Sequence, residues 1–275
     1  MSDGIADGPP ALTHLEPHPA LGNRLASAPG ILCCLDFDGT LAPIVEDPAD
    51  AELLPAARAA LERLAGDPTV TVAVVSGRSL ADLRERVDVA DVVHAGNHGL
   101  ELDEGSASTV DPEAVARRPA VEAAVARLRA ELDGVPGCIV EDKGVTASVH
   151  YRRTPDEHVP TVREAAREAA AATDGLRLTE GKRVLELRPD VPGGKDRAVR
   201  RLREHHPDAL PLFVGDDVTD EDAFRALPTE GVAVLVGDRE DTAASIRVPA
   251  PDDAAAFLHW VADVRADADG PGAGT

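Results

Sequence analysis

The segment CCLDFDGTLAPIVEDP, residues 33–48, places two aspartates directly after an apolar run. Residues 31–36 read ILCCLD, and a short apolar run of this kind predicts a strand that is buried on both faces. Asp36 ends the run, and Asp38 follows two positions later, in front of a Gly-Thr pair. Two carboxylates at the end of a buried strand predict a polar site at that edge of a sheet.

Strands and helices alternate along most of the chain. Buried strands are expected at 31–36, 69–75, 91–95, 210–217 and 231–237. Helices are expected at 55–65, from 79, from 195, near 220–228 and at 251–267. This alternation predicts an α/β fold in which helices cover both faces of a parallel sheet.

The middle of the chain has a different order of elements. Residues 113–132 and 155–172 are helical segments rich in Ala and Glu, and two strand pairs at 138–153 and 176–189 surround short turns. The order predicts an antiparallel sheet with helices, inserted into the first fold. We therefore expect a core domain at 26–101 and 189–268, an inserted α/β domain at 102–188, and flexible ends at 1–25 and 269–275.

Four polar clusters fall at the expected carboxyl ends of the core strands or at a helix start. They are Asp36, Asp38 and Thr40; Ser76, Gly77 and Arg78; Lys195; and Asp216, Asp217 and Asp220. Ligands of open parallel sheets bind beyond the carboxyl ends of the strands, so the clusters should share one site. Clustered carboxylates suit a hard cation such as Mg²⁺, and the hydroxyl and cationic groups suit anionic oxygens. Together they predict phosphoryl transfer, with one carboxylate as nucleophile and a second managing protons.

Each cluster has a simpler interpretation when it is taken alone. A D-x-D pair is commonly a turn or a helix cap, an SGR tripeptide is commonly a plain loop, and an acidic run such as GDDVTDED is commonly a solvated surface. The placement of all of them at strand ends, in one order, favours the functional interpretation.

The charge balance narrows the class of partner. The formal net charge is −22, which argues against nucleic acid and against an anionic membrane, because both require a basic face. The acidic surplus is typical of a protein from a salt-rich cytoplasm, although a GC-rich genome that favours Arg codons is the alternative. The first 25 residues lack the basic and apolar segments of a signal peptide, and Cys33, Cys34 and Cys138 lack metal-site spacing. We therefore expect a cytoplasmic protein with reduced thiols.

Lysine is rare in this chain. Only Lys143, Lys182 and Lys195 occur among the 28 basic residues, and each lies at an expected turn or helix start. A cation in the first turn of a helix, as expected for Lys195, opposes the helix dipole and needs a negative partner. An ammonium and a guanidinium are not interchangeable, so we expect the three lysines to be retained for their chemistry.

The segments DFDGTL, SGR, GGKDRAV and GDDVTDED resemble the four motifs of phosphatases of the haloacid dehalogenase superfamily. With AGNHGLEL, VEDKGVTASVHYR and GKRVLELRP, the chain is similar to the trehalose-6-phosphate phosphatases over about residues 31–240. The resemblance implies a Rossmann-like core with a mobile cap domain, and Mg²⁺-dependent hydrolysis of trehalose 6-phosphate through an aspartyl-phosphate, in trehalose biosynthesis. A trehalose-6-phosphate synthase would be a candidate partner.

The same resemblance implies roles for individual residues. Asp36 would be the nucleophile, Asp38 the general acid and base with its carbonyl on Mg²⁺, and Lys195 would neutralise the aspartyl-phosphate. Thr40, Ser76 and Gly77 would bind phosphate, with Arg78 beside the site. Asp216 would complete the metal shell, and Asp217 and Asp220 would bind the metal through water or orient its ligands. Asn97, His98, Lys143, His150, Arg152, Lys182 and Glu186 would contact the sugar or lie at the hinge.

Two alternatives remain open on the sequence alone. The substrate could be another sugar phosphate, such as sucrose 6-phosphate or mannosyl-3-phosphoglycerate, or the reaction that of a phosphomutase, because the cap would select the sugar. The chain could also be a non-catalytic sugar-phosphate-binding partner of a synthase. His150 could be a packed histidine, and strand alternation by itself makes one face around Glu186 polar.

Overall fold

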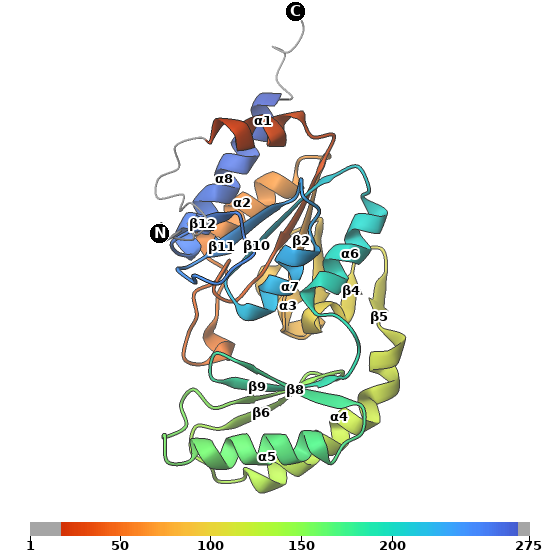
Figure 1. Ribbon diagram of the computed structural model, residues 1–275, viewed down its shortest axis with the longest axis vertical. Coiled ribbons are helices and arrows are strands. Elements are labelled where there is room, and N and C mark those ends of the chain that lie inside the picture. The colour runs from red at the N-terminus through yellow and green to blue at the C-terminus, as the bar shows by residue number, and fades with distance from the viewer. Residues whose placement is uncertain (1–17, 269–275) are drawn as a thin grey trace, which may run out of the picture.

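The computed structural model describes residues 18–268, which form a larger and a smaller sheet with their helices (Figure 1). The larger sheet has the strand order β12-β11-β10-β1-β2-β3-β4-β5. Its strands are β1 (Ile31–Leu35), β2 (Val70–Val75), β3 (Val92–Gly96), β4 (Glu101–Asp103), β5 (Ser108–Val110), β10 (Leu210–Gly215), β11 (Val232–Val236) and β12 (Ile246–Val248). The pairs from β12 to β3 are parallel, and β4 and β5 add antiparallel strands at one edge. This is the predicted Rossmann-like α/β core.

Helices pack on both faces of the larger sheet. One face carries α1 (Pro19–Ser27), α2 (Pro55–Ala65), α3 (Leu80–Val87) and α8 (Pro251–Ala268), and the other carries α6 (Lys195–His205) and α7 (Val218–Ala226). The residues of β1 alternate between the two apolar cores, so Cys33 and Cys34 lie on opposite faces as expected. Both strand faces are therefore dry, which explains the continuous apolar runs.

The smaller sheet is antiparallel, with the order β6-β7-β9-β8. It consists of β6 (Ile139–Asp142), β7 (Ala147–His150), β8 (Leu176–Gly181) and β9 (Val184–Pro189). The helices α4 (Pro112–Glu131) and α5 (Val159–Ala171) pack on one of its faces through a separate apolar core. Figure 1 shows that the opposite face of this cap sheet is turned toward the larger domain. Side chains alternate along a strand, and the residues on that face include Glu141, Ser148, His150, Thr179 and Glu186, so the face is largely polar.

Two details differ from the expected boundaries. Residues 19–25 were expected to be flexible, but they belong to α1, whose Leu21 and Leu25 are buried in the core. Their spacing of four places both on one helix face. Residues 101–110 form strands of the larger sheet, so a start of the insert near 111 fits the strand pairing better than 102. The expected flexibility of residues 1–17 and 269–275 concerns segments that lie outside the described residues.

No helix within residues 18–268 is both long and apolar enough to span a bilayer.

Candidate functional site

The floor of the site is built by three neighbouring strand ends. Asp36 follows β1, Ser76 follows β2 and Asp216 follows β10, and β10, β1 and β2 lie side by side in parallel. All three residues line one cavity of about 560 Å³ that extends toward the cap sheet. The expected convergence of the polar clusters at this edge is confirmed.

Lys195 lies at the centre of this floor. It begins α6, its side chain is 3% exposed, and its Nζ lies 2.6 Å from Asp36 Oδ1 and 2.8 Å from Asp220 Oδ1. Burial lowers the pKa of Lys195, but the two carboxylates outweigh it and hold the pKa above its usual value. Burial and the nearby Asp220 and Asp216 raise the pKa of Asp36, which Lys195 partly offsets. The negative partner that a lysine in a first helical turn needs is thus present.

Three carboxylates on this floor could hold a cation. Oxygens of Asp36, Asp216 and Asp220 lie within 4.8 Å of one another. Asp216 Oδ1 is buried and has no hydrogen-bond partner among the described residues. A Cβ at Gly39, which has φ +85°, would clash with the Asp216 carboxylate, so the backbone approach needs glycine there. Oxygen ligands and an unsatisfied buried carboxylate fit a hard cation such as Mg²⁺.

The carboxylates of Asp38 and Asp217, which were expected to act through a backbone carbonyl and through water or orientation, also line the cavity and have protein partners. The Asp217 side chain caps α7 by accepting from the N–H of Val218 at 2.7 Å, and the Asp38 carboxylate is paired with Arg78. Neither belongs to the group of three. Asp220 also accepts from the N–H groups of Asp216 and Asp217, at 3.1 and 2.9 Å, so it shapes the loop as well.

The residues expected to bind phosphate surround Asp36 unevenly. Ser76 lines the cavity, and its Oγ accepts from the N–H of Arg78 at 3.2 Å. Gly77 also lines the cavity, and a Cβ there would come within 2.6 Å of the His98 ring. Thr40 is fully buried beside the floor rather than in the cavity lining, and its Oγ1 has no partner among residues 18–268.

The opposite wall of the cavity is the polar face of the cap sheet. Glu186 is its central carboxylate, with one oxygen 3.0 Å from Lys143 Nζ and the other 2.8 Å from His98 Nε2. Burial raises the pKa of Glu186, but His98, Lys143 and Arg188 outweigh it and hold the pKa well below the usual range. Burial also lowers the pKa of His98 to about 4, so the imidazole is neutral near pH 7. Glu186 therefore joins a core residue to a cap residue.

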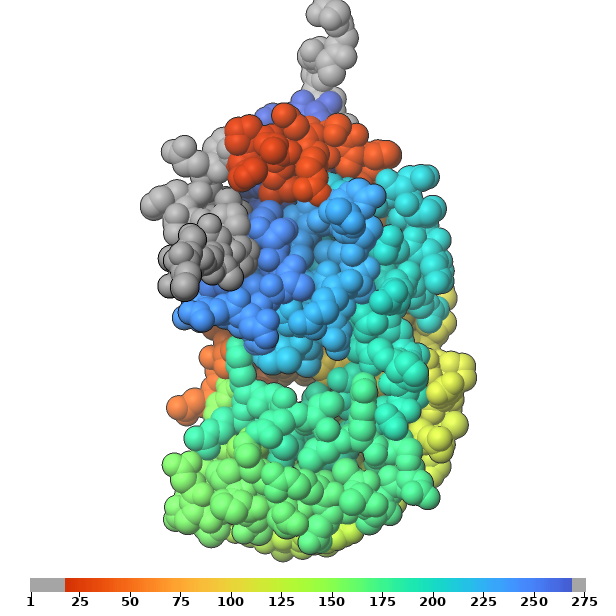
Figure 2. Space-filling model, in the orientation of Figure 1, coloured from red at the N-terminus to blue at the C-terminus, as the bar shows by residue number. Residues whose placement is uncertain are grey.

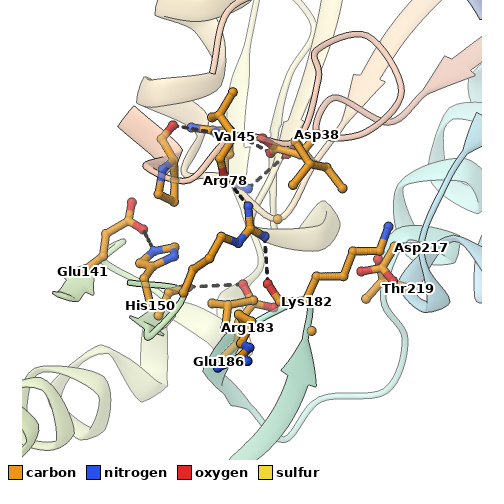
Figure 3. Close-up of a pocket in the computed structure, with 18 of the residues that line it drawn as sticks. Asp38, Val45, Arg78, Glu141, His150, Lys182, Arg183, Glu186, Asp217 and Thr219 are labelled. Carbon is orange, nitrogen blue, oxygen red and sulfur yellow. Dashed lines mark hydrogen bonds and ion pairs between the residues drawn. The ribbon is translucent and has the colours of Figure 1, made fainter. Parts of the chain in front are cut away.

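His150 and Glu141 form a pair on the same wall. Figure 3 shows the two side chains together, with His150 Nε2 2.7 Å from Glu141 Oε2. Both line the cavity, and the His150 side chain is 17% exposed. Burial raises the pKa of Glu141. The hydrogen bond with His150 and the charge of Lys143 outweigh burial, so the pKa of Glu141 lies below its usual value.

Two cap side chains reach across to the core. Lys182 Nζ lies 2.6 Å from Asp216 Oδ2, and Lys182 points toward the α7 end of the cavity in Figure 3. Arg152 donates to the carbonyl oxygens of Val45 and Lys182. All three lysines of the chain therefore line the cavity. In the space-filling view, only a narrow hollow separates the cap from the core (Figure 2).

Asn97 belongs to the joint between the domains rather than to the cavity lining. It is fully buried, its Nδ2 donates to Glu101 at 2.7 Å and to the Lys143 carbonyl at 3.2 Å, and its Oδ1 accepts from Thr146. Asn97 thus ties the turn between β6 and β7 to the core.

Sequence reasoning missed several residues that line the cavity. They include Val45, Asp47, Glu141, Ser148, Arg153, Thr179 and Arg183. Strand alternation, which places every second residue of β6, β7 and β8 on the polar face, could have found Glu141, Ser148 and Thr179. No sequence pattern marks the loop residues, because only the folded chain brings the loop of Val45 and Asp47 together with the cap loops of Arg153 and Arg183.

Comparison with known proteins agrees with this geometry. A family model described as trehalose-phosphatase matches residues 34–252. The chain belongs to the trehalose-phosphatase family. The match includes the ends of β1, β2 and β10, Lys195 and the whole cap sheet, so the resemblance expected from the motifs is confirmed.

Relatives of this family member carry the corresponding names. The trehalose-phosphate phosphatase of Mycobacterium marinum is 41% identical over 232 residues, which are 81% of this chain and 59% of the relative. That of Mycolicibacterium paratuberculosis is 43% identical over 242 residues, 83% of this chain and 61% of the relative. The chain thus spans about three fifths of the length of these curated relatives.

A solved structure extends the comparison to the fold. The C-terminal domain of trehalose-6-phosphate phosphatase from C. albicans superposes with a TM-score of 0.80 at 26% identity, covering 94% of this chain and 99% of that one. The similarity includes both sheets, so this trehalose-phosphatase family member shares its core and its cap with that domain.

Proposed function

We propose that this protein is a Mg²⁺-dependent phosphatase that hydrolyses trehalose 6-phosphate to trehalose and phosphate through an aspartyl-phosphate. The observation that carries the proposal is the buried Asp36 beside Lys195, on the floor of a cavity whose other wall is a polar cap sheet. The family match and the names of the relatives support the substrate.

The proposed chemistry has two displacement steps at phosphorus. In the first, Asp36 Oδ attacks phosphorus, the bond from phosphorus to the sugar oxygen breaks, and Asp38 gives its proton to the leaving oxygen. In the second, water attacks the phosphorus of the aspartyl-phosphate while Asp38 accepts a proton from it. Phosphate leaves, Asp36 is a free carboxylate again, and Asp38 is again protonated.

The residues around Asp36 would prepare it for this role. Lys195 lies 2.6 Å from one Asp36 oxygen and would offset negative charge on the aspartyl-phosphate. Asp36, Asp216 and Asp220 would hold Mg²⁺, with the Asp38 carbonyl, and the bound ion would neutralise the phosphoryl oxygens. Ser76 and the backbone at Gly77 would bind the remaining phosphate oxygens.

The cap wall has the chemistry that a disaccharide needs. Lys143, His150, Arg152, Lys182 and Glu186 supply donors and acceptors suited to sugar hydroxyls. The cavity volume of about 560 Å³ lies within the range typical of small-molecule sites. We propose that these residues choose the sugar while the floor performs the chemistry.

The composition supports a setting for this activity. A net charge of −22 with few lysines suits a salt-rich cytoplasm, where dense surface carboxylates keep a protein dissolved. Trehalose would serve there as a compatible solute, and a trehalose-6-phosphate synthase is a candidate partner because it would make the substrate.

A substrate panel tests the proposal. Phosphate release is measured from trehalose 6-phosphate, sucrose 6-phosphate, mannosyl-3-phosphoglycerate and glucose 6-phosphate, with Mg²⁺ or EDTA, from low to molar salt. The wild type should prefer trehalose 6-phosphate and require Mg²⁺, and Asp36→Asn should lose about 10⁴-fold in rate or more. Asp217→Asn, outside the carboxylate group, is the matched control and should lose less than about tenfold.

Each other outcome identifies a different error. Preference for another sugar would retain the mechanism and reassign the cap. Full activity of Asp36→Asn would remove the proposed nucleophile. Absence of hydrolysis at every salt concentration would favour a non-catalytic binding protein.

A further inference from the structure

Arg78 was expected beside the phosphate site, and its hydrogen bonds are directed at protein groups. An arginine side chain has five N–H donors in a rigid plane. Nε donates to Asp38 Oδ2 and Nη2 to Asp38 Oδ1, both at 2.7 Å, in a two-bond fork. Nη2 also donates to the Pro48 carbonyl at 2.9 Å, and Nη1 donates to Asp82 Oδ2 at 2.7 Å. Four of the five donors are thus engaged within the protein.

The surroundings of Arg78 hold it in this position. Its guanidinium carbon lies 5.3 Å from the ring centre of Phe37, the fully buried residue between the two aspartates. Asp82 is held in turn by Arg86, whose Nε lies 2.9 Å from both Asp82 oxygens. The Arg78 side chain is only 11% exposed, so water competes little for these bonds. The plane of the fork is therefore fixed from several sides.

Asp38, the partner of the fork, is more exposed than Arg78. The Asp38 side chain is 41% exposed and lies after a strand end, and among the described residues its carboxylate hydrogen-bonds only Arg78. A carboxylate that accepts two bonds from an arginine retains further lone pairs for a proton. Arg78 and Asp38 both line the cavity, and Figure 3 shows them next to each other, joined by dashed bonds.

We propose that Arg78 is a positioning residue for the proton-transferring carboxylate of Asp38 and not a ligand of the substrate phosphate. This assignment rests on the proposed function, in which Asp38 protonates the leaving sugar oxygen. Arg78 orients the Asp38 carboxylate with two bonds, while the Pro48 carbonyl, Asp82 and the Phe37 ring fix the guanidinium. The role of Arg78 is then confined to the step in which the leaving group takes a proton.

The leaving group separates the two roles. A sugar alkoxide is a poor leaving group and needs the proton, whereas p-nitrophenolate leaves without one. A phosphate ligand acts on both substrates, because both carry the same phosphoryl group. The value of kcat/KM reports steps up to the first phosphoryl transfer, so later hydrolysis of the aspartyl-phosphate does not mask the difference.

The experiment compares trehalose 6-phosphate with p-nitrophenyl phosphate in the full chain. For Arg78→Ala, kcat/KM should fall about 100-fold on the sugar phosphate and less than about fivefold on the aryl phosphate. Asp38→Asn should show the same split, and the double variant should lose little more than either single variant, because both changes remove one function. Ser76→Ala, a phosphate ligand in the proposed function, should lose similar factors on both substrates.

Two further variants keep the test decisive. Arg78→Lys keeps the positive charge but cannot form the two-bond fork. Asp82→Asn weakens the contact that holds the other side of the Arg78 guanidinium. If Arg78→Ala fails to fold, as judged by thermal melting, both should show the same split with smaller losses. Equal losses on the two substrates, or losses that add in the double variant, would overturn the assignment while leaving the proposed function intact. A wild type that hydrolyses neither substrate would overturn both, since no leaving group would then need Asp38.

Discussion

The floor and the cap wall of the cavity hold their charges in different ways. On the floor, Lys195 and Asp220 are at most 3% exposed and are fixed by strand ends and the first turn of a helix. On the wall, Lys182 is 47% exposed, and its long side chain crosses to Asp216. Buried charges must be paired in one geometry, whereas partly exposed ones exchange partners with water at little cost. The charged groups of the floor are therefore held in one arrangement, whereas those of the wall can give up their protein partners when a ligand binds.

The largest expected effect tests the buried charges of the floor. Lys195→Ala would leave Asp36 and Asp220 without their shared cation, so the free energy of unfolding should fall by about 3–5 kcal/mol. Urea unfolding at pH 7 in EDTA measures it. The loss should shrink on acidification, because burial raises the pKa of Asp36 and a protonated Asp36 needs no cation.

Lys182→Ala is the control for this comparison. Its half-exposed ion pair should contribute less than about 1 kcal/mol. Similar losses in the two variants would show that the floor and the wall do not differ in the way described.

A smaller effect tests the joint between the wall and the core. Glu186→Gln should lower the free energy of unfolding at pH 7 by about 2 kcal/mol, because the carboxylate that pairs with charged Lys143 and hydrogen-bonds His98 is replaced by a neutral amide. The pKa of Glu186 is lowered in the folded protein, so its ionised form contributes stability above its usual pKa. That contribution is lost as the pH falls toward the folded pKa, so the difference from wild type should vanish in acid.

Urea unfolding of both proteins between pH 3 and pH 7 checks this prediction. Glu164→Gln, on the exposed surface of α5, is the matched control and should change little at any pH. A Glu186→Gln deficit that stays constant down to the lowest pH would contradict an ionic origin.

The smallest effect concerns the contact between the wall and the candidate metal site. Lys182 Nζ donates a hydrogen bond to Oδ2 of Asp216, and Asp216 is one of the three aspartates that would hold Mg²⁺. Lys182→Met should therefore tighten Mg²⁺ binding without substrate by up to about fivefold, the equivalent of one partly exposed ion pair. Calorimetric titration of the full chain measures it. Weaker binding in Lys182→Met would mean that Lys182 supports the cation site instead of competing with it.

Much of the core could be predicted because its signals are local. The apolar run up to Leu35 predicts β1, and the alternation with helices predicts the parallel sheet with ligands at its carboxyl edge. The helix α1 was missed because nine residues with weak periodicity look like a loop until Leu21 and Leu25 meet α8. The strands β4 and β5 were placed in the insert because three-residue strands carry little pattern of their own.

For the candidate site, residue type and placement after a strand were enough to name Asp36, Asp216 and Lys195. They were not enough to distinguish the direction of each side chain. Asp217 was expected near the metal, and the structure adds that its side chain caps α7. Arg78 was expected beside the phosphate, and the structure adds that it donates to Asp38. Asn97 was assigned to the sugar or the hinge, and its bonds to Lys143 and Thr146 place it at the hinge.

By itself, the sequence determined which strands are buried, where they end, and which acids and lysines follow those ends. These features depend only on the order of residues along the chain and on the spacing of the apolar ones. Only the tertiary structure decided which oxygens meet Lys195, that Glu186 joins the cap to His98, and that Arg78 serves Asp38. Those choices depend on side-chain directions and on contacts between residues far apart in the chain. They are set by the need to pair every buried charge in the space that remains once the sheets have packed.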